Sequence, residues 1–210
     1  MTETLFHHGV DIGLKSLARG MPLRIATLGP EGTSSEAAAQ ALAVALARRG
    51  HETVQVDLLD TYESAAARVL DGHANLVIVA NAYADVSEFY MEPRFQLTAA
   101  FVKDTPNYGL AALKPWEGEG SLTVASHPAP IPLIEQLLPE GLTVAAIVPA
   151  LSTSAAAEAA LQGRVDAALT TVPAAGLRGL RFFTRTRSIR MLWSVFKAAE
   201  IQARGPGATR

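Results

Sequence analysis

Short runs rich in aliphatic and β-branched residues alternate with alanine-rich segments from residue 23 almost to the end of the 210-residue chain. The short runs favour strands, and the alanine-rich segments favour helices. We expect strands at 23–27, 53–59, 75–80, 95–102, 108–113, 121–126, 142–148 and 165–171. We expect helices at 34–49, 62–72, 131–138 and 153–162. Alternation of this kind predicts an α/β fold with mostly parallel strands.

The strand–helix alternation starts twice, first at residue 23 and again at residue 121. Between the two starts, 95–102 and 108–113 are expected to be antiparallel or crossing strands. A repeated start of this kind predicts two α/β lobes joined by crossing strands, with a ligand cleft between the lobes.

The expected boundaries follow from the same pattern. The run 179–198 is expected to form two strands that return to the first lobe. We predict an N-terminal extension at 1–22, a first lobe at 23–103 plus 179–198, a second lobe at 104–178, and a polar, flexible tail at 199–210.

Composition excludes several classes of function. The chain is 49% hydrophobic and 18% charged, which is typical of a globular protein. A net charge of -2 gives no reason to expect nucleic acid or an anionic membrane as partner, so a small-molecule ligand is expected. Cysteine is absent and the five histidines show no ligand spacing with carboxylates, so neither a metal nor a cofactor is expected. Residues 1–20 have no continuous apolar run, which favours a cytoplasmic location over secretion or membrane insertion.

The turn GPEGTSSE at 29–36 follows the first expected strand and begins the first expected helix. Its hydroxyl residues Thr33, Ser34 and Ser35 accompany the unpaired amides of a helix N-terminus, which is a binding site for anions. Helix capping by one hydroxyl, with Glu36 completing a capping box, is the simpler explanation. Because one hydroxyl would suffice for capping, we favour binding of an anionic ligand.

A second helix start of the same kind follows the strand at 142–148, where Ser152, Thr153 and Ser154 precede an alanine-rich helix. Taken alone, this is a common helix cap. Two such starts facing one cleft would suit a substrate with two carboxylates.

A third strand-to-helix turn contains Ser126 and His127, followed by proline. The imidazole of His127 could donate to a ligand carboxylate or hold a proton near neutral pH. A histidine at a helix start more often only caps the helix.

Aromatic and polar residues gather after the strand at 75–80. Asn81, Tyr83 and Tyr90 could line a ring-binding pocket with hydrogen-bonding groups, although core packing explains their aromatic neighbours equally well. Of the arginines between 181 and 190, which would normally cover a solvated strand face, Arg187 is the one we expect to help bind an anion.

These residues resemble a known family. LGPEGTSSE at 28–36 resembles the opening G-P-x-G-T-x-S signature of prephenate dehydratases, and SHP at 126–128 and STSAAA at 152–157 resemble that family's second-lobe motifs. The chain is more similar still to the bacilysin-type prephenate decarboxylases. The motifs that carry this similarity are TLGPEGTSSE, DTYES at 60–64, FYM at 89–91, DTPNYGLA at 104–111, SHPAPIPLI and RSIRMLWSVF at 187–196. The resemblance implies a two-lobed fold like that of periplasmic binding proteins.

The departures from the dehydratase pattern concern the choice of reaction. Dehydratases carry a Thr-Arg-Phe motif whose threonine helps the ring hydroxyl to leave, whereas this chain reads Met191-Leu192-Trp193-Ser194 there. We expect Leu192 and Trp193, in place of threonine and arginine, to remove the proton donor and to keep water out of the site. The regulatory ACT domain that usually follows is not expected, and neither is feedback control by phenylalanine.

The resemblance therefore implies loss of carbon dioxide from prephenate without aromatisation, giving a dihydro-4-hydroxyphenylpyruvate for a non-proteinogenic amino acid of an antibiotic or other secondary-metabolite pathway. Tyr83, His127, Tyr108 or a bound water could supply the ring proton. We expect Thr33, Ser34 and Ser35 to bind one carboxylate and Ser152, Thr153 and Ser154 to bind the other. Besides prephenate, we expect no partner other than a second copy of the chain in a homodimer. A prephenate dehydratase and a non-catalytic anion-binding protein are the alternatives.

Overall fold

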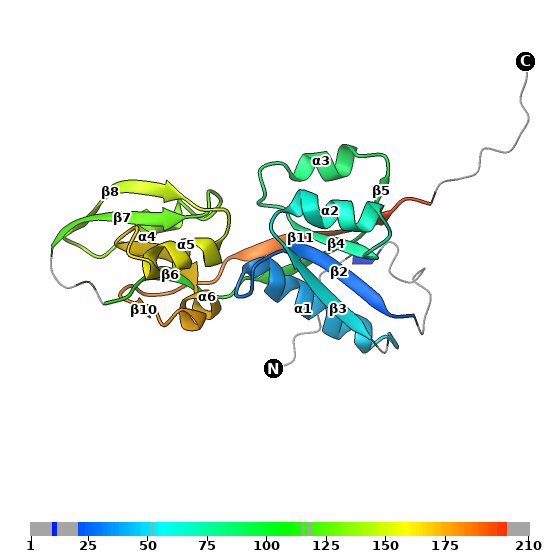
Figure 1. Ribbon diagram of the computed structural model, residues 1–210, viewed down its shortest axis with the longest axis horizontal. Coiled ribbons are helices and arrows are strands. Elements are labelled where there is room, and N and C mark those ends of the chain that lie inside the picture. Colours follow the sequence, from blue (N-terminus) through cyan, green and yellow to red (C-terminus); the bar gives the residue numbers. More distant parts are fainter. Residues whose placement is uncertain (1–9, 12–20, 52, 115, 117–118, 201–210) are drawn as a thin grey trace, which may run out of the picture.

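A computed structural model describes residues 10–11, 21–51, 53–114, 116 and 119–200. Most of the expected N-terminal extension and nearly all of the expected tail lie outside the described residues. Figure 1 shows two lobes placed end to end along the long axis of the molecule.

The first lobe contains a six-stranded sheet in the order β1-β5-β11-β4-β2-β3. Its strands are β1 (Val10–Asp11), β2 (Leu23–Leu28), β3 (Val54–Leu59), β4 (Leu76–Ala80), β5 (Phe95–Asp104) and β11 (Arg190–Ala198). Its helices are α1 (Ser34–Ala47), α2 (Tyr62–Leu70) and α3 (Val86–Met91). Strands β2, β3 and β4 are parallel, whereas β11 lies between β4 and β5 and is antiparallel to both.

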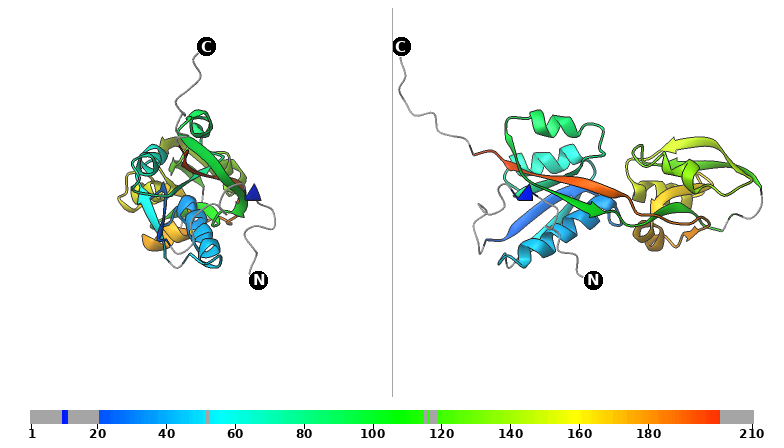
Figure 2. Two further views of the ribbon diagram at one scale, coloured as in Figure 1. Left: turned by 90° about the vertical axis from the view of Figure 1, so that its right-hand side faces the viewer. Right: turned by 180° about the vertical axis from the view of Figure 1, so that it is seen from behind.

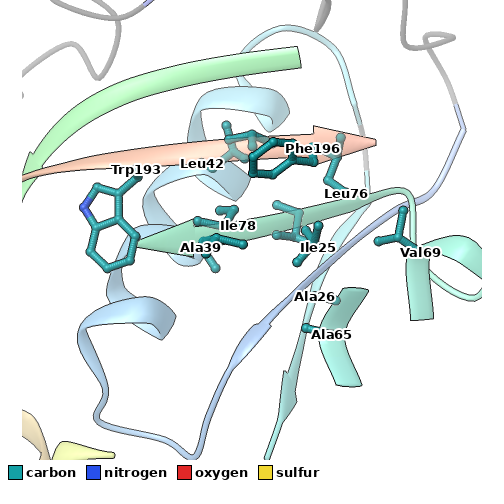
Figure 3. Packing of buried hydrophobic residues seen from close by; sticks show 14 of the residues in the cluster. Ile25, Ala26, Ala39, Leu42, Ala65, Val69, Leu76, Ile78, Trp193 and Phe196 are labelled. Carbon is teal, nitrogen blue, oxygen red and sulfur yellow. The ribbon is translucent and has the colours of Figure 1, made fainter. Parts of the chain in front are cut away.

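Alternation along β2 explains how this sheet is covered on both faces. Consecutive side chains of a strand point to opposite faces, and both Ile25 and Ala26 are fully buried. In Figure 3, Ala26 lies beside Ala65 of α2, whereas Ile25 lies among the larger side chains that pack around Leu42 of α1. The two helices therefore cover opposite faces, which leaves the carboxyl ends of the parallel strands free to form a site.

The second lobe contains a five-stranded sheet in the order β10-β6-β9-β7-β8. Its strands are β6 (Tyr108–Ala112), β7 (Gly120–Ser126), β8 (Leu142–Pro149), β9 (Ala167–Thr171) and β10 (Arg181–Phe182). Its helices are α4 (Leu133–Leu137), α5 (Thr153–Leu161) and α6 (Val172–Leu177). Strands β7, β8 and β9 are parallel, and β6 and β10 are antiparallel additions.

Two chain segments cross between the lobes, β5 to β6 and β10 to β11, and they lie side by side in Figure 1 and in the right-hand view of Figure 2. At the boundary, the backbones of Tyr108 and Arg187 form two hydrogen bonds of 2.7 and 2.9 Å. We expected both strands of 179–198 to return to the first lobe, and this is wrong for β10, which pairs with β6 of the second sheet. The reason is that the chain crosses between the lobes only after β10.

The predicted two-lobed α/β fold is confirmed, with central parallel strands in each lobe. Both sheets are nevertheless mixed, because the crossing strands run against the parallel ones. The short helices α3 and α6 were not predicted, since six residues are too few to show a helical period. Among the described residues, no helix combines the length and apolar character needed to span a membrane.

Candidate active site

A cavity lies between the two lobes at the carboxyl ends of the parallel strands. Its volume is about 160 Å³, and cavities of comparable size admit a six-membered ring. The first lobe lines it with Leu28, Thr33, Ser34, Ser35, Tyr62, Ala80, Ala82 and Tyr83. The second lobe lines it with Tyr108, His127, Ala129, Pro130, Ser152 and Thr153, and the returning chain adds Ile189, Met191 and Trp193.

Thr33 is the N-cap of α1. Its hydroxyl oxygen accepts a hydrogen bond of 3.2 Å from the Glu36 amide and donates to the Leu28 carbonyl oxygen. The Glu36 carboxylate accepts a bond of 2.6 Å from the Gly32 amide, which completes a close variant of the capping box. Both hydrogen-bonding functions of the Thr33 hydroxyl are thus used within the protein, as the capping explanation predicts.

Ser34 and Ser35 each pair with a tyrosine. The Ser34 hydroxyl lies 2.7 Å from the hydroxyl of Tyr108, and the Ser35 hydroxyl lies 2.7 Å from that of Tyr62. Burial raises the pKa of Tyr108, and it raises the pKa of Tyr62 to about 12. Both tyrosines therefore carry their protons near neutral pH, so these pairs are hydroxyl networks in which a proton can be shared.

Ser154 does not line the cavity. Its hydroxyl donates a bond of 2.7 Å to the Glu31 carbonyl oxygen, and the Thr171 hydroxyl donates one of 2.6 Å to the carbonyl of Gly32. Gly32 has φ +89°, and a Cβ placed there would come within 2.8 Å of the Ala174 Cα atom. The glycine turn therefore holds the two lobes together, and only glycine fits there.

The start of α5 carries a buried, unpartnered hydroxyl in a residue that lines the cavity. Ser152 is the N-cap, and its hydroxyl oxygen accepts a bond of 3.0 Å from the Ala155 amide. Thr153 is 6% exposed, and its buried hydroxyl has no partner among the described residues. A buried hydroxyl without a partner costs free energy, so its position beside first-turn amides points to a ligand that supplies the acceptor.

His127 lines the cavity and is half-buried, and its ring accepts a bond of 3.2 Å at Nδ1 from the Ala129 amide. This bond places the proton of the neutral imidazole on Nε2. Burial lowers the pKa of His127, so the neutral form predominates near pH 7. Ser126 is fully buried outside the cavity lining, and its hydroxyl donates to the His127 carbonyl oxygen.

Tyr83 lies on the wall between this cavity and an adjoining one that includes Glu63. Its hydroxyl donates a bond of 2.7 Å to the Glu63 carboxylate, and its ring centroid is 4.9 Å from that of Tyr62. Burial and the carboxylate together raise the pKa of Tyr83. Burial also acts to raise the pKa of Glu63, but hydrogen bonds led by that from Tyr83 lower it on balance, so this carboxylate stays ionised.

Asn81 and Arg187 are not among the residues that line the cavity. Asn81 accepts a bond of 2.8 Å from Ser194 and donates one of 3.1 Å to Tyr90, so its side chain is part of a polar network in the first lobe. Arg187 is exposed and donates a bond of 2.5 Å to the Gln136 side chain. The side chains of both residues, and those of Ser126 and Ser154, form hydrogen bonds within the protein, and their expected substrate contacts stay predictions.

The returning strand β11 forms an apolar wall. Met191 and Trp193 line the cavity, and the Trp193 indole nitrogen donates a bond of 3.2 Å to the Lys103 carbonyl oxygen. Leu192 is 42% exposed because neighbouring side chains of a strand point to opposite faces. We expected Leu192 and Trp193 to exclude a proton donor. In the structure Met191 and Trp193 form this part of the wall instead.

Positive side chains are scarce around the cavity. No lysine or arginine occurs among the described residues that line it. In the same part of the chain, no three histidine, aspartate or glutamate side chains gather closely enough to hold a metal ion. Bound anions would therefore be held by hydroxyls, by first-turn amides and by the positive ends of α1 and α5.

Comparison with known proteins places these features in a family. No protein-family model matches the chain. The chain is 38% identical over 183 residues to a prephenate decarboxylase from Bacillus amyloliquefaciens, covering 85% of this chain and 88% of that protein. A prephenate decarboxylase from Planktothrix agardhii is 37% identical over 185 residues, covering 83% and 87%. The chain belongs to the prephenate decarboxylase family.

A solved prephenate dehydratase has a fold similar to that of this prephenate decarboxylase family member. A prephenate dehydratase from Arthrobacter aurescens, solved with L-Phe, superposes with a TM-score of 0.65 at 17% identity over 85% of this chain. The chain spans 61% of that enzyme's length. A periplasmic substrate-binding protein of an ABC transporter from Coxiella burnetii gives a TM-score of 0.51 at 17% identity, covering 84% of each chain. The predicted two-lobed, binding-protein-like fold is thus confirmed.

Tyr62, Glu63 and Met191 are among the residues of the site that were not singled out from the sequence. Tyr62 and Glu63 lie within the DTYES motif, and they were not separated from it because a tyrosine and a glutamate at a helix start have no distinctive spacing. We did not separate Met191 from the residues that follow it. The alternation of side chains along a strand would have assigned it to the same face as Trp193.

Proposed function

We propose that this protein decarboxylates prephenate without aromatising the ring. The carbon–carbon bond between the quaternary ring carbon and its carboxylate breaks, carbon dioxide leaves, and the released electron pair passes into the diene. A proton then adds to a ring carbon while the ring hydroxyl is kept. The product is a dihydro-4-hydroxyphenylpyruvate.

The proposed binding of prephenate rests on the unpartnered hydroxyl of Thr153. This hydroxyl is buried at the start of α5, beside amides that have no partner within the helix. We assign the pyruvyl carboxylate of prephenate to this position, because a carboxylate supplies the acceptor that the hydroxyl lacks.

The carboxylate that is lost should lie elsewhere. Strong binding of its charge would stabilise the substrate more than the transition state, in which that charge disperses. The cavity has an apolar wall formed by Met191, Trp193 and Ile189. A charged carboxylate is poorly solvated against such a wall, whereas neutral carbon dioxide does not need that solvation. We therefore assign the ring carboxylate to the part of this wall around Trp193, so that one strong anion site replaces the two that we expected.

Tyr108 is the proton donor that best fits the geometry. Tyr83 donates its proton to an ionised carboxylate, which can only accept, so that proton is already engaged. Tyr108 shares its proton with the Ser34 hydroxyl, and either oxygen of that pair can be the donor. As Tyr108 gives its proton to the ring carbon, Ser34 can donate to the phenolate oxygen that forms. His127 presents Nε2–H as a neutral donor to a substrate oxygen.

Product analysis by NMR after reaction with prephenate in deuterated water tests the proposal. We expect release of one carbon dioxide, a retained carbinol proton and one deuterium on the ring. Phenylpyruvate as the main product would show a dehydratase instead. Tight binding of prephenate without release of carbon dioxide would show a binding protein.

The product is a 2-oxo acid, so a reaction that transfers an amino group is the step we propose next, towards a non-proteinogenic amino acid. A cytoplasmic location stays a prediction, which fractionation of cells and immunodetection would test. The homodimer also stays a prediction.

A further inference from the structure

Strand β8 ends the sheet of the second lobe, and no strand of the described part of the chain pairs with its outer edge. It pairs with β7 in a parallel register from Leu142 to Pro149, and it is the last strand in the sheet order. Figure 1 shows it at the rim of the lobe. The backbone groups on its outer side are therefore available to a further strand.

The second half of β8 is apolar yet exposed on both faces. Residues 145–149 are all exposed, with Ile147 39% and Val148 40% accessible. Leu151, just beyond the strand, is 75% accessible. The helices of this lobe thus leave the end of β8 uncovered.

Charge distinguishes β8 from the other sheet edges that the structure describes. Strand β3, the edge of the first sheet, carries Asp57, which forms ion pairs of 3.2 Å with Arg24 and Arg68. Strands β1 and β10 are two residues long. Charged or short edges resist pairing with another sheet. In contrast, no charged residue occurs from 142 to 157, so β8 lacks this protection.

We propose that β8 pairs antiparallel with β8 of a second copy of this chain, forming a two-fold homodimer with one continuous sheet across the interface. An identical strand brings the same uncharged, aliphatic surface, so no charge is buried without a partner and no like charges meet. An edge strand of another protein would typically carry charged residues, as β3 does. Those charged residues would lose hydration beside Ile147 and Val148. The added strand also shields one flank of each of those side chains.

The first experiment measures the mass of the full-length protein by sedimentation equilibrium. We expect a dimer for the wild type and a dissociation constant about 100-fold weaker for Ile147→Lys, because the lysine would lose its hydration at the two-fold interface. Leu177→Lys is the matched control, since Leu177 is 55% exposed on α6 of the same lobe. It should leave the dimer intact. A monomeric wild type, or a dimer that Ile147→Lys does not weaken, overturns the proposal.

A second experiment does not depend on disrupting the interface. Because the chain has no cysteine, single cysteines can be placed at Ala145, Ala146, Ile147 or Val148 without competing thiols. Facing residues of antiparallel strands lie close enough for a disulfide. Mild oxidation should crosslink two chains through at least one of these positions, and a cysteine at Leu177 should not crosslink. A dimer that crosslinks at none of the four β8 positions overturns the assignment of the interface.

Discussion

The Ser34 hydroxyl on α1 and the Tyr108 hydroxyl on β6 lie 2.7 Å apart, so one hydrogen bond on the cavity wall joins the two lobes. The proposed proton donor is therefore held in place by a residue of the opposite lobe. Two more hydrogen bonds across the boundary, from Ser154 and Thr171, hold the turn that leads into α1. The contacts that hold the two lobes together thus include the proposed proton-donating pair itself.

Replacing Tyr108 by phenylalanine should lower kcat about 100-fold or more, because general acid catalysis contributes at least that much. The melting temperature should fall only slightly, since one buried hydrogen bond is worth about 1 kcal/mol. Carbon dioxide release under steady-state conditions and thermal unfolding measure the two effects.

Ser34→Ala is the control for this prediction. It removes the partner but keeps the tyrosine hydroxyl, so we expect a roughly tenfold smaller loss of kcat than in Tyr108→Phe. A Tyr108→Phe enzyme with the wild-type kcat would assign the proton to His127 or to water.

Replacing Thr153 by valine should weaken binding and strengthen the fold at the same time. Loss of a hydrogen bond to a charged carboxylate should raise KM about 10- to 100-fold. The free energy of unfolding without substrate should rise by up to about 1 kcal/mol, because a buried hydroxyl without a partner is removed. Kinetics with prephenate and denaturant titration of the free protein measure the two quantities.

Thr98→Val provides a matched control. Thr98 on β5 is also fully buried with an unpartnered hydroxyl, but it lies outside the cavity lining. It should stabilise the fold in the same way and leave KM unchanged. An unchanged KM in Thr153→Val would remove this hydroxyl from the carboxylate site.

Much of the fold was predictable because it depends on local patterns. The buried run at 76–80 and the alanine-rich helix after Thr33 are both read directly from residue types. The helix starts at Thr33 and Ser152 were predictable for the same reason, since a cap needs only a hydroxyl and nearby amides. Both residues do act as caps.

The use of each hydroxyl was not predictable, because it depends on residues far away in the chain. Ser34 and Ser35 are adjacent, yet their partners are 74 and 27 residues away on different lobes. Ser154 follows Thr153 directly, but the helix turns it towards Glu31 of the other lobe. Arg187 was proposed for its charge alone, and nothing in the sequence indicates that Gln136 lies beside it.

The half-buried His127 predicts a dependence of stability on pH. Its pKa is lowered by burial, so the unfolded chain takes up a proton at a higher pH than the folded protein does. This contribution to stability is fully present above the unfolded pKa of about 6.5 and is lost as pH falls through the lower folded pKa. His127→Gln should therefore lose less melting temperature than the wild type on going from about pH 7 to pH 5. Melting curves across this range test it, and parallel losses in both proteins would show that His127 titrates normally in the fold.

The apolar wall of β11 predicts how the reaction can be redirected. Met191 faces the cavity, whereas Leu192 points away from it, so a threonine hydroxyl can reach the substrate only from position 191. Met191→Thr should raise the phenylpyruvate fraction of the product roughly tenfold, because a proton donor near the ring hydroxyl lets water leave as carbon dioxide does. Chromatography of the products after complete conversion of prephenate measures this fraction. Leu192→Thr adds the same hydroxyl on the opposite face and should give the wild-type product. An equal rise in both variants would mean that water enters a loosened site. No rise in either variant would mean that another residue controls whether the ring hydroxyl is lost. Tyr83, which lies beside Glu63, is the first such residue to test.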